Sequence, residues 1–411
     1  MMNSYTNTKP FRSFIIVFSL LLVDDGYLQE VEQNLEPSQL LWMSLNSNFE
    51  IEVEITESIQ AGIKAMEFIG DQILVGLEYS VVPELLPLLL SYNDVHHDGE
   101  LVTHKSKEGG EQYLQQIHSD TTVFIEPAFD NADVAETLKE HVDLEMVKPI
   151  SEELLSKFNT RYAYSPTGRK AAKWILQQFE EIAAPRDDIT VEGITEPDSN
   201  QISVVVSIQG TSSTDNVVLG SHLDSTSQND GPMTKKKDAP GMDDNASGVL
   251  VLMEILRVIV ETGYQPETNV QLMAVAAEEL GLLGSQQIAA DYAAKGKNVL
   301  GMLQFDGCGY QGPIDFLFTK DFSNNDHAEF LAHLTKVYLP GKTYMFFTCG
   351  YECSDYASWY INGYPSGYAM ESAQNPNYHT QNDKFIDFDY MGNFVRLGLV
   401  YLAELAKGAV A

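Results

Sequence analysis

Hydrophobic and polar positions follow two periodicities in the second half of this chain. Helical spacing of apolar residues predicts helices over 169–181, 245–262 and 282–295. Continuous apolar or β-branched runs predict strands at 203–208, 217–220, 270–277, 299–305 and 364–370. A continuously apolar strand such as 270–277 is typical of a sheet covered on both faces. We therefore predict an α/β fold with three α/β/α layers and a mixed, largely parallel central sheet.

The first part of the chain has a different character. Lys9 and Arg12 precede an apolar run from Phe14 to Val23, which is shorter than the roughly 20 residues of a membrane span and is typical of a signal segment. A buried N-terminal strand or an uncleaved anchor is the alternative. We predict a signal peptide at 1–26, a small α/β pro-segment at 27–135 and the main domain at 136–411. The protein is then expected outside the cell or in the periplasm, and free of the membrane after processing.

The charge of the chain restricts its partners. Its 411 residues contain 25 Lys and Arg against 59 Asp and Glu, a formal net charge of −34. Nucleic acids and anionic membrane surfaces are therefore unfavourable partners. Lys235–Lys237 is the one basic run, and we interpret it as a solvated loop. The His96–His97 pair lies among acidic residues in a polar segment and is interpreted in the same way.

Five potential metal ligands occur where a predicted strand ends or a loop begins: His222, Asp243, Glu279, Asp306 and His379. In open α/β sheets, ligands gather beyond the carboxyl ends of the strands, so these side chains are expected to converge. Imidazole and carboxylate groups suit divalent zinc. An additional carboxylate, Glu278, can act as a base for water. Together these residues point to a hydrolase with two metal ions.

Two of these assignments have a simpler structural alternative. Asp224 lies two residues after His222, on the same face of an extended segment, where it can accept a hydrogen bond from the imidazole and fix its tautomer. His-x-Asp alone is a common pattern. Asp243 and Asp244 precede a predicted helix, where carboxylates also stabilise the helix dipole without binding any ion.

The cysteines leave a choice open. Cys349 and Cys353 form a short-loop disulfide if the protein is exported, whereas in a reducing compartment the same pair could bind a metal or remain reduced. Cys308 is then left as a free thiol, two residues after Asp306.

Four motifs together resemble a known group. They are Gly-Ser-His-Leu-Asp-Ser at 220–225, Ala-Pro-Gly-Met-Asp-Asp-Asn-Ala-Ser-Gly at 239–248, Ala-Ala-Glu-Glu-Leu-Gly-Leu-Leu-Gly-Ser at 276–285 and Thr-Cys-Gly-Tyr-Glu-Cys-Ser-Asp-Tyr-Ala-Ser-Trp at 348–359. In this order, over about 140–406, they resemble the bacterial secreted leucyl aminopeptidases. These are co-catalytic zinc exopeptidases of the glutamate carboxypeptidase-like superfamily.

The resemblance implies a role for each residue. Asp243 would bridge two Zn²⁺ ions, with His222 and Asp306 on one and Glu279 and His379 on the other. Glu278 would be the general base and acid. Cys349 and Cys353 would form a disulfide, with Tyr351 between them placed to stabilise the tetrahedral intermediate. The substrate would be a peptide or protein N-terminus with an apolar first residue such as leucine, and the enzyme is expected to be a monomer.

The sequence departs from the group where its specificity pocket is built. Gly307 and Cys308 follow Asp306 where a larger apolar residue is usual, and the segments 366–370 and 373–378 differ in length and aromatic content. Two alternatives keep the same fold. One is a glutaminyl cyclase-type acyltransferase, which uses a single zinc, and the other is a non-catalytic binding domain that has lost its metals.

Overall fold

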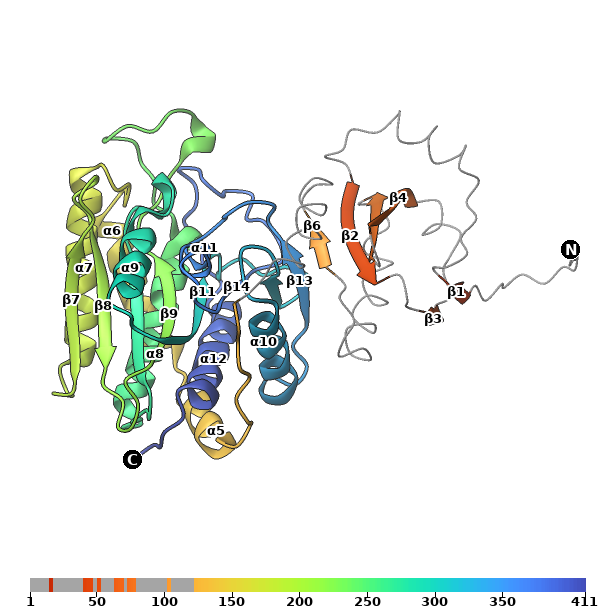
Figure 1. Ribbon diagram of the computed structural model, residues 1–411. Helices are drawn as coiled ribbons and strands as arrows, with labels where there is room; N and C mark the ends of the chain where they lie inside the picture. The colour runs from red at the N-terminus through yellow and green to blue at the C-terminus, as the bar shows by residue number, and fades with distance from the viewer. Residues whose placement is uncertain are drawn as a thin grey trace, which may run out of the picture. The chain divides into compact units, whose positions relative to one another are not determined.

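The computed structural model describes residues 122–411, and nearer the N-terminus the backbone of the short strands at 15–17, 40–46, 50–52, 63–69, 72–78 and 102–104 (Figure 1). The chain forms two compact units. One comprises Met1–Ser119 with Met345–Gly350, and the other Asp120–Tyr344 with Tyr351–Ala411. The predicted signal peptide other than Ile15–Val17, His96–His97 and most of the predicted pro-segment lie outside the described residues. The segmentation at 26 and 135 stays a prediction.

The described strands of the first unit that precede residue 105 pair antiparallel with one another. β2 (Leu40–Asn46) pairs with β5 (Gln72–Glu78) and with β6 (Val102–His104), and β5 also pairs with β4 (Ile63–Ile69). β1 (Ile15–Val17) pairs separately with β3 (Glu50–Glu52). No proposed ligand belongs to these strands.

A mixed sheet forms the centre of the second unit. Its strands are β7 (Ile189–Thr195), β8 (Ile202–Ile208), β9 (Asn216–His222), β10 (Asn269–Val275), β11 (Val299–Phe305), β12 (Phe316–Thr319) and β14 (Ser366–Met370). Their spatial order is β12-β14-β11-β9-β10-β8-β7. The four central strands, β14, β11, β9 and β10, are mutually parallel, and the outer pairs are antiparallel. β13 (Tyr344–Thr348) is the remaining strand after residue 122, and most of it belongs to the first unit.

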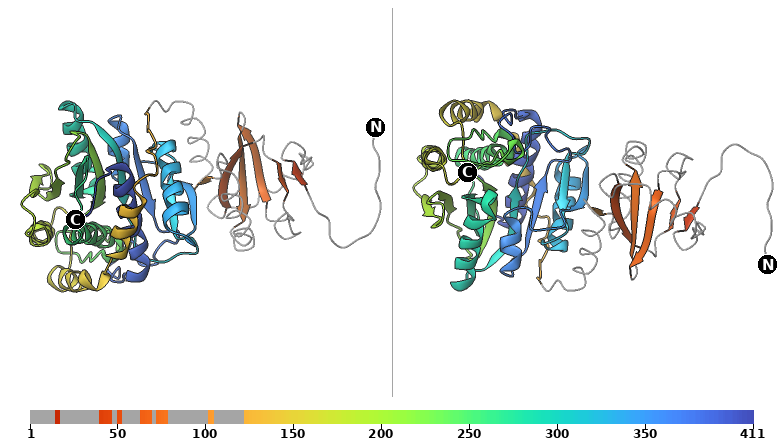
Figure 2. Two further views of the ribbon diagram at one scale, coloured as in Figure 1. Left: turned by 90° about the horizontal axis from the view of Figure 1, so that it is seen from below. Right: turned by 90° about the horizontal axis from the view of Figure 1, so that it is seen from above.

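Helices cover both faces of this sheet, as the two turned views in Figure 2 show. On one face α7 (Pro166–Ala183), α8 (Gly248–Glu261) and α12 (Phe388–Leu405) contact the strands, with α5 (Ala132–Glu140) and α10 (Asn325–Tyr338) beside α12. On the other face lie α9 (Leu283–Ala294) and α11 (Tyr356–Ile361). α6 (Lys148–Lys157) packs beside the segment 242–247. The predicted three-layer α/β/α fold is confirmed.

Side chains alternate between the two helical layers along each central strand. Val218, Met273 and Met302 pack towards α9 and α11 in one core cluster that also contains Trp359. On the opposite face, Phe305 meets Phe394 of α12 edge to face, with 6.4 Å between ring centroids. Burial on both sides explains why these strands are continuously apolar instead of alternating with polar residues.

One helix begins later than the sequence pattern indicates. Asn245 is not the N-cap of α8. It lies in a turn, Met242–Ser247, and Ser247 is the N-cap residue. Asn245 still serves the helix start, because its Oδ1 accepts a hydrogen bond from the Gly248 N–H at 3.0 Å. The predicted end of this helix at 262 agrees with the structure, since α8 ends at Glu261 and Gly263 follows it with φ +61°.

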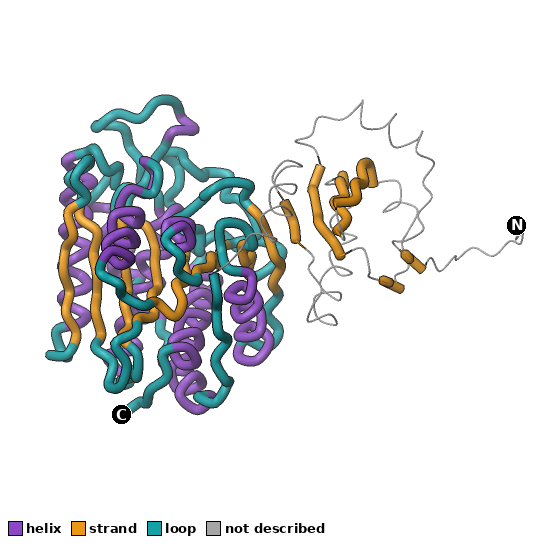
Figure 3. The backbone as a smooth tube through the Cα atoms, viewed as in Figure 1, coloured by secondary structure: helices purple, strands orange, loops and turns teal. Residues whose placement is uncertain are grey.

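The topology brings the ends of several strands together. The parallel register aligns His222 at the end of β9 with Val275 at the end of β10, so Glu278 and Glu279 follow next to it. β11 lies on the other side of β9 and is followed by Asp306. Loops and turns, teal in Figure 3, extend beyond this edge. Within the part of the chain that the structure describes, no helix is long and apolar enough to traverse a bilayer.

We expect the strand that carries His222 to be sensitive to cavity formation. Leu219 is completely buried in β9, between Leu272 of β10 and Leu303 of β11. Leu219→Ala should lower the free energy of unfolding by about 2–5 kcal/mol, measured by urea titration. Val337→Ala is the control, because Val337 is 57% exposed on α10, and its effect should stay within about 0.5 kcal/mol. Equal losses in both variants would contradict this packing.

Candidate metal centre

Two imidazoles meet a single carboxylate at the edge of the sheet. The Nε2 atom of His222 lies 3.0 Å from Oδ1 of Asp244, and the Nε2 atom of His379 lies 2.8 Å from its Oδ2. Asp306 Oδ1 is 3.2 Å from His222 Nε2, and Glu279 Oε2 is 3.2 Å from His379 Nε2. The five side chains thus form two groups of three that share Asp244, and the donor atoms in each group lie within 4.8 Å of one another.

The shared carboxylate is Asp244, which corrects the prediction of Asp243. Asp244 has an extended backbone (φ −109°, ψ 95°), and successive side chains of an extended segment point in opposite directions. Asp243 therefore faces away from the imidazoles. Its Oδ1 accepts a hydrogen bond from the Gly309 N–H at 2.8 Å, and its Oδ2 accepts one from Asn375 Nδ2 at 2.9 Å. Asp243 supports the surrounding loops.

The other predicted ligands, His222, Glu279, Asp306 and His379, lie in the two groups as expected. His222 is the last residue of β9, and Asp306 directly follows β11. Glu279 lies in a short turn after β10, and His379 in a loop after β14, with the left-handed φ of +56°. The aromatic ring of Tyr378 stacks on the His379 imidazole, with 3.7 Å between centroids.

Asp224 links His222 to the two glutamates. It is completely buried, and its Oδ1 lies 3.5 Å from Nδ1 of His222. The same carboxylate accepts hydrogen bonds from the N–H groups of Glu278, at 3.0 Å, and Glu279, at 3.3 Å. This arrangement leaves the Nε2 atom of His222 directed at Asp244 and Asp306. Asp224 thus lies beside His222, whereas its predicted hydrogen bond with Nδ1 stays a prediction, because the separation is 3.5 Å.

Several supporting residues were not predicted from the sequence. Ser354 donates a hydrogen bond from Oγ to Oδ2 of Asp306 at 2.7 Å. Asp383 accepts hydrogen bonds from the N–H groups of both Asp243 and Asp244, at 3.1 and 3.0 Å. Ser354 lies in the motif at 348–359, next to Cys353, and Asp383 lies four residues after His379. Their proximity in sequence to residues already considered could have indicated a role, but their contacts depend on the tertiary structure.

A buried arginine holds the loop that carries Asp244. The Arg161 side chain donates to the carbonyl oxygens of Leu223 at 2.8 Å and Gly241 at 2.7 Å, and also to that of Pro240. It is 1% exposed, and burial lowers the pKa of its guanidinium although Asp383 and other nearby carboxylates oppose that shift. Its donors serve backbone carbonyl groups, so the carboxylates of the two ligand groups are left for another partner.

The electrostatics of the centre favour a cation. Burial raises the pKa of Glu279 to about 7, and Asp244 contributes to this rise. Burial also raises the pKa of Glu278 well above its usual range, and Glu279 and Asp355 add to the effect. For His379, burial alone would lower the pKa, but hydrogen bonds with Asp244 and Glu279 raise it to about 10. The site therefore disfavours further negative charge and attracts positive charge.

The donor set fits divalent metal ions. Glu279 Oε1 is buried without a hydrogen-bond partner, which is costly unless a cation or water satisfies it. Nitrogen and oxygen donors in groups of three match zinc sites that keep a position open for water or substrate. Because both oxygens of Asp244 face an imidazole, one on each side, the arrangement can hold two ions.

Tyr351, Cys349 and Cys353 lie in the motif at 348–359, which also contains Ser354, the hydrogen-bond donor to Asp306. Cys349 and Cys353 are disulfide-bonded, which leaves Cys308 as a buried free thiol. Tyr351 lies between the bonded cysteines and is 54% exposed, so a substrate can reach it. Burial of its inner part raises the pKa of the Tyr351 hydroxyl, and the charge of Glu278 raises it further.

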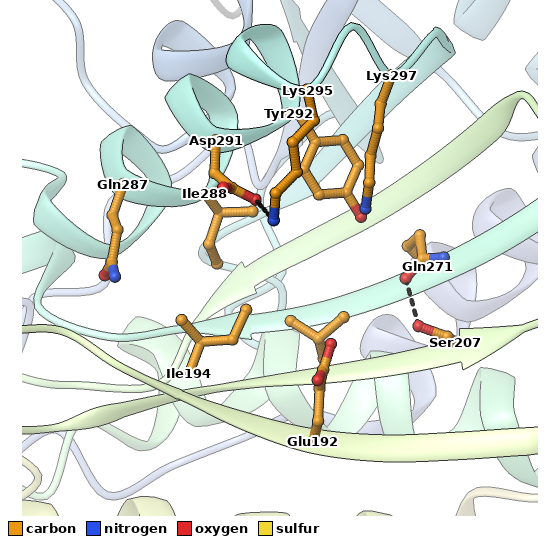
Figure 4. Close-up of a pocket in the computed structure, with 11 residues that line it drawn as sticks. Glu192, Ile194, Ser207, Gln271, Gln287, Ile288, Asp291, Tyr292, Lys295 and Lys297 are labelled. Atoms are coloured by element: carbon orange, nitrogen blue, oxygen red, sulfur yellow. Dashed lines mark hydrogen bonds and ion pairs between the residues drawn. The ribbon is translucent and has the colours of Figure 1, made fainter.

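A separate cavity lies over the sheet between α9 and strands β7, β8 and β10 (Figure 4). Its volume is about 440 Å³. Its polar lining is partly paired, since Lys295 contacts Asp291 at 2.7 Å and Ser207 donates a hydrogen bond to Gln271 at 2.7 Å. None of its lining residues belongs to the two ligand groups. The candidate centre is therefore the cluster around Asp244.

Comparison with known proteins agrees with this choice. Residues 203–397 match the model of peptidase family M28, a range that includes all five side chains of the two groups. The chain is 36% identical over 301 residues to leucine aminopeptidase 1 of Trichophyton equinum, an alignment that covers 67% of this chain and 76% of the relative. This relative is fungal, whereas the sequence motifs suggested the bacterial group.

Solved structures share the fold. LapB from Legionella pneumophila is 23% identical, with a TM-score of 0.63 over 90% of this chain and 100% of its own. A glutaminyl cyclase from Tannerella forsythia is 18% identical, with a TM-score of 0.52 over 64% of this chain and 98% of its own. A glutaminyl cyclase thus shares this fold, so the fold by itself does not decide the activity of the chain. The sequence match to a leucine aminopeptidase and to the family model shows that the chain belongs to peptidase family M28.

Proposed function

We propose that this chain is a secreted aminopeptidase that removes apolar N-terminal residues such as leucine from peptides, with two zinc ions. The observation that carries the proposal is the pair of ligand groups around Asp244. His222 and Asp306 would hold one ion, Glu279 and His379 the other, and Asp244 both. The leucine aminopeptidase relative supports the activity and the side-chain preference. Export is supported by the apolar run after Lys9 and Arg12.

Zinc ions at these positions would acidify the attacking water and polarise the carbonyl group of the scissile bond. Glu278 is the proton carrier of this chain. Its backbone N–H is held by Asp224, and its carboxyl group has a pKa raised by burial, as suits a general base and acid. Glu278 takes the proton from water during attack and returns it to the nitrogen of the leaving amine.

Tyr351 supports the developing negative charge. Its hydroxyl is a donor beside the disulfide, and a hydrogen bond to the oxyanion of the tetrahedral intermediate would stabilise the transition state. One such donor contributes on the order of 3 kcal/mol. The pKa of Tyr351 is raised, so its hydroxyl stays protonated at neutral pH and can donate a hydrogen bond.

The carboxylates also explain the preference for a free N-terminus. An α-ammonium group is attracted to the acidic centre, whereas an acylated N-terminus carries no charge there. A terminal carboxylate would instead need a basic subsite. In the Lys235–Lys237 run the first two side chains are exposed, and Lys237 donates to the carbonyl oxygens of Ser227 and Gly231. We propose further that the enzyme works as a monomer, without nucleic acid, and away from the membrane once processed.

A substrate panel tests the activity. Leucyl-p-nitroanilide should be hydrolysed, N-acetyl-leucyl-p-nitroanilide should not, and a peptide with N-terminal glutamine should not be cyclised. The readouts are released nitroaniline and the mass of the glutamine peptide. Cyclisation without hydrolysis would establish the cyclase alternative, and the absence of both reactions, with or without bound zinc, would indicate a non-catalytic binding domain.

The shared carboxylate predicts a difference between two neighbouring aspartates. Asp244→Asn should lose at least one equivalent of zinc, because the amide offers only one neutral oxygen donor between the two ions. Asp243→Asn should keep both equivalents, because its side chain faces Gly309 and Asn375. Metal analysis after gel filtration measures the zinc content. The reverse pattern would restore Asp243 as the bridge.

Substitutions of the neighbouring residues Glu278 and Glu279 should likewise have different effects on the zinc content. Glu278→Ala is expected to keep both zinc ions and to lose at least about 10²-fold in kcat on leucyl-p-nitroanilide, since it removes the general base and acid. Glu279→Ala should lose one zinc ion, because it removes a ligand. Equal loss of metal in the two variants would show that their roles are not divided as proposed.

A further inference from the structure

A short turn remote in sequence holds the loop of His379. It is η5, Gln228–Asp230, which comes after the end of β9. The Asn229 N–H donates to the carbonyl oxygen of His379 at 3.0 Å, and Asn229 Nδ2 donates to that of Tyr378 at 2.9 Å. Asp230 Oδ2 accepts a hydrogen bond from the Gln381 N–H at 2.7 Å. The turn therefore fixes the backbone on both sides of His379.

The side chain of Gln228 reaches the imidazole itself. Its amide nitrogen, Nε2, is placed 3.1 Å from Nδ1 of His379, while Nε2 of the imidazole faces Asp244 and Glu279. The two ring nitrogens thus have separate partners. Gln228 contacts the nitrogen that points away from the candidate metal centre.

The tautomer of His379 decides which end of the amide must face it. An imidazole that binds a metal through Nε2 carries its hydrogen on Nδ1, so the partner of Nδ1 has to be an acceptor. A glutamine amide offers an acceptor oxygen and a donor nitrogen, and rotation by about 180° exchanges them. The acceptor, Oε1, is the atom compatible with a metal on Nε2.

We propose that Gln228 is a positioning residue for metal binding at His379. Its Oε1 accepts the Nδ1–H hydrogen bond and so holds the ring in the tautomer whose Nε2 lone pair faces Asp244 and Glu279. This inference rests on the metal site of the proposed function and gives His379 the counterpart of Asp224 beside His222. The two partners differ, because Asp224 is a buried carboxylate and Gln228 an exposed neutral amide.

Zinc titration of two Gln228 variants tests this role. Gln228→Met has a similar length but no acceptor, and it should weaken one of the two zinc-binding steps about tenfold. This is the low end of the range for such partners, since water can partly replace an exposed amide. Gln228→Glu keeps an acceptor and should bind zinc at least as tightly as the wild type. The measurement is competition of the chelator-stripped full chain with a chromophoric zinc chelator.

Two controls separate this role from charge and from general damage. Gln381→Glu adds the same negative charge two residues from His379, so Gln228→Glu should bind zinc more tightly than Gln381→Glu if acceptance by Oε1 matters. Gln178→Met makes the matched substitution on α7, where Gln178 bonds the exposed Glu181. Its zinc affinity should equal that of the wild type.

The outcomes distinguish this inference from the proposed function. Wild-type affinity in Gln228→Met, or equal weakening in Gln228→Met and Gln228→Glu, would overturn the role of Gln228. Two bound zinc ions and leucyl-p-nitroanilide hydrolysis in the wild type would leave the proposed function intact in that case. A wild-type chain that binds no zinc would overturn both.

Discussion

The need to neutralise buried carboxylates dominates the second unit of this protein. Asp224, Asp244, Glu279 and Asp306 lie together around two imidazoles where the central strands end. Burying an ion costs several kcal/mol, so such a cluster persists only with compensating positive charge and well-made hydrogen bonds. Arg161 directs its donors to backbone carbonyl groups. A pair of divalent cations is the partner that the remaining donor atoms suit.

The fold serves this constraint by placing rigid strand ends beside one another. β9, β10 and β11 are parallel neighbours, so the loops after these strands emerge at the same edge of the sheet. The loops are then held by hydrogen bonds from buried charged groups. Asp383 receives the N–H groups of Asp243 and Asp244, and Arg161 holds the carbonyl groups just before them. The backbone of Asp244, the residue shared by the two ligand groups, is thereby held in place.

Similarity of fold leaves the chemistry open. An aminopeptidase-like architecture also occurs in a glutaminyl cyclase, so the sheet and its helices are compatible with hydrolysis and with acyl transfer. Hydrolysis is favoured here by the side-chain set: two ligand groups joined by Asp244, an additional carboxylate at Glu278 and an exposed tyrosine beside the disulfide. Membership of peptidase family M28 agrees with that set.

The sequence by itself determined the layers of the fold and most of the site. Apolar runs specified the buried strands because both sheet faces are covered, and His222, Glu279 and Asp306 were found because polar residues directly follow those runs. Spacing of apolar residues likewise located α8 and α9, although the start of α8 was placed too early. The Cys349–Cys353 bond was expected from the resemblance to a known group.

Only the tertiary structure decided which aspartate faces the imidazoles and which residues orient them. Asp243 and Asp244 are chemically identical neighbours, and the direction of each depends on the local backbone, which Asp383 and Arg161 hold from distant parts of the chain. Gln228 and His379 are 151 residues apart and meet through a turn with no apolar pattern of its own. Periodicity records which face of an element is buried, and it carries no information on contacts between polar loops.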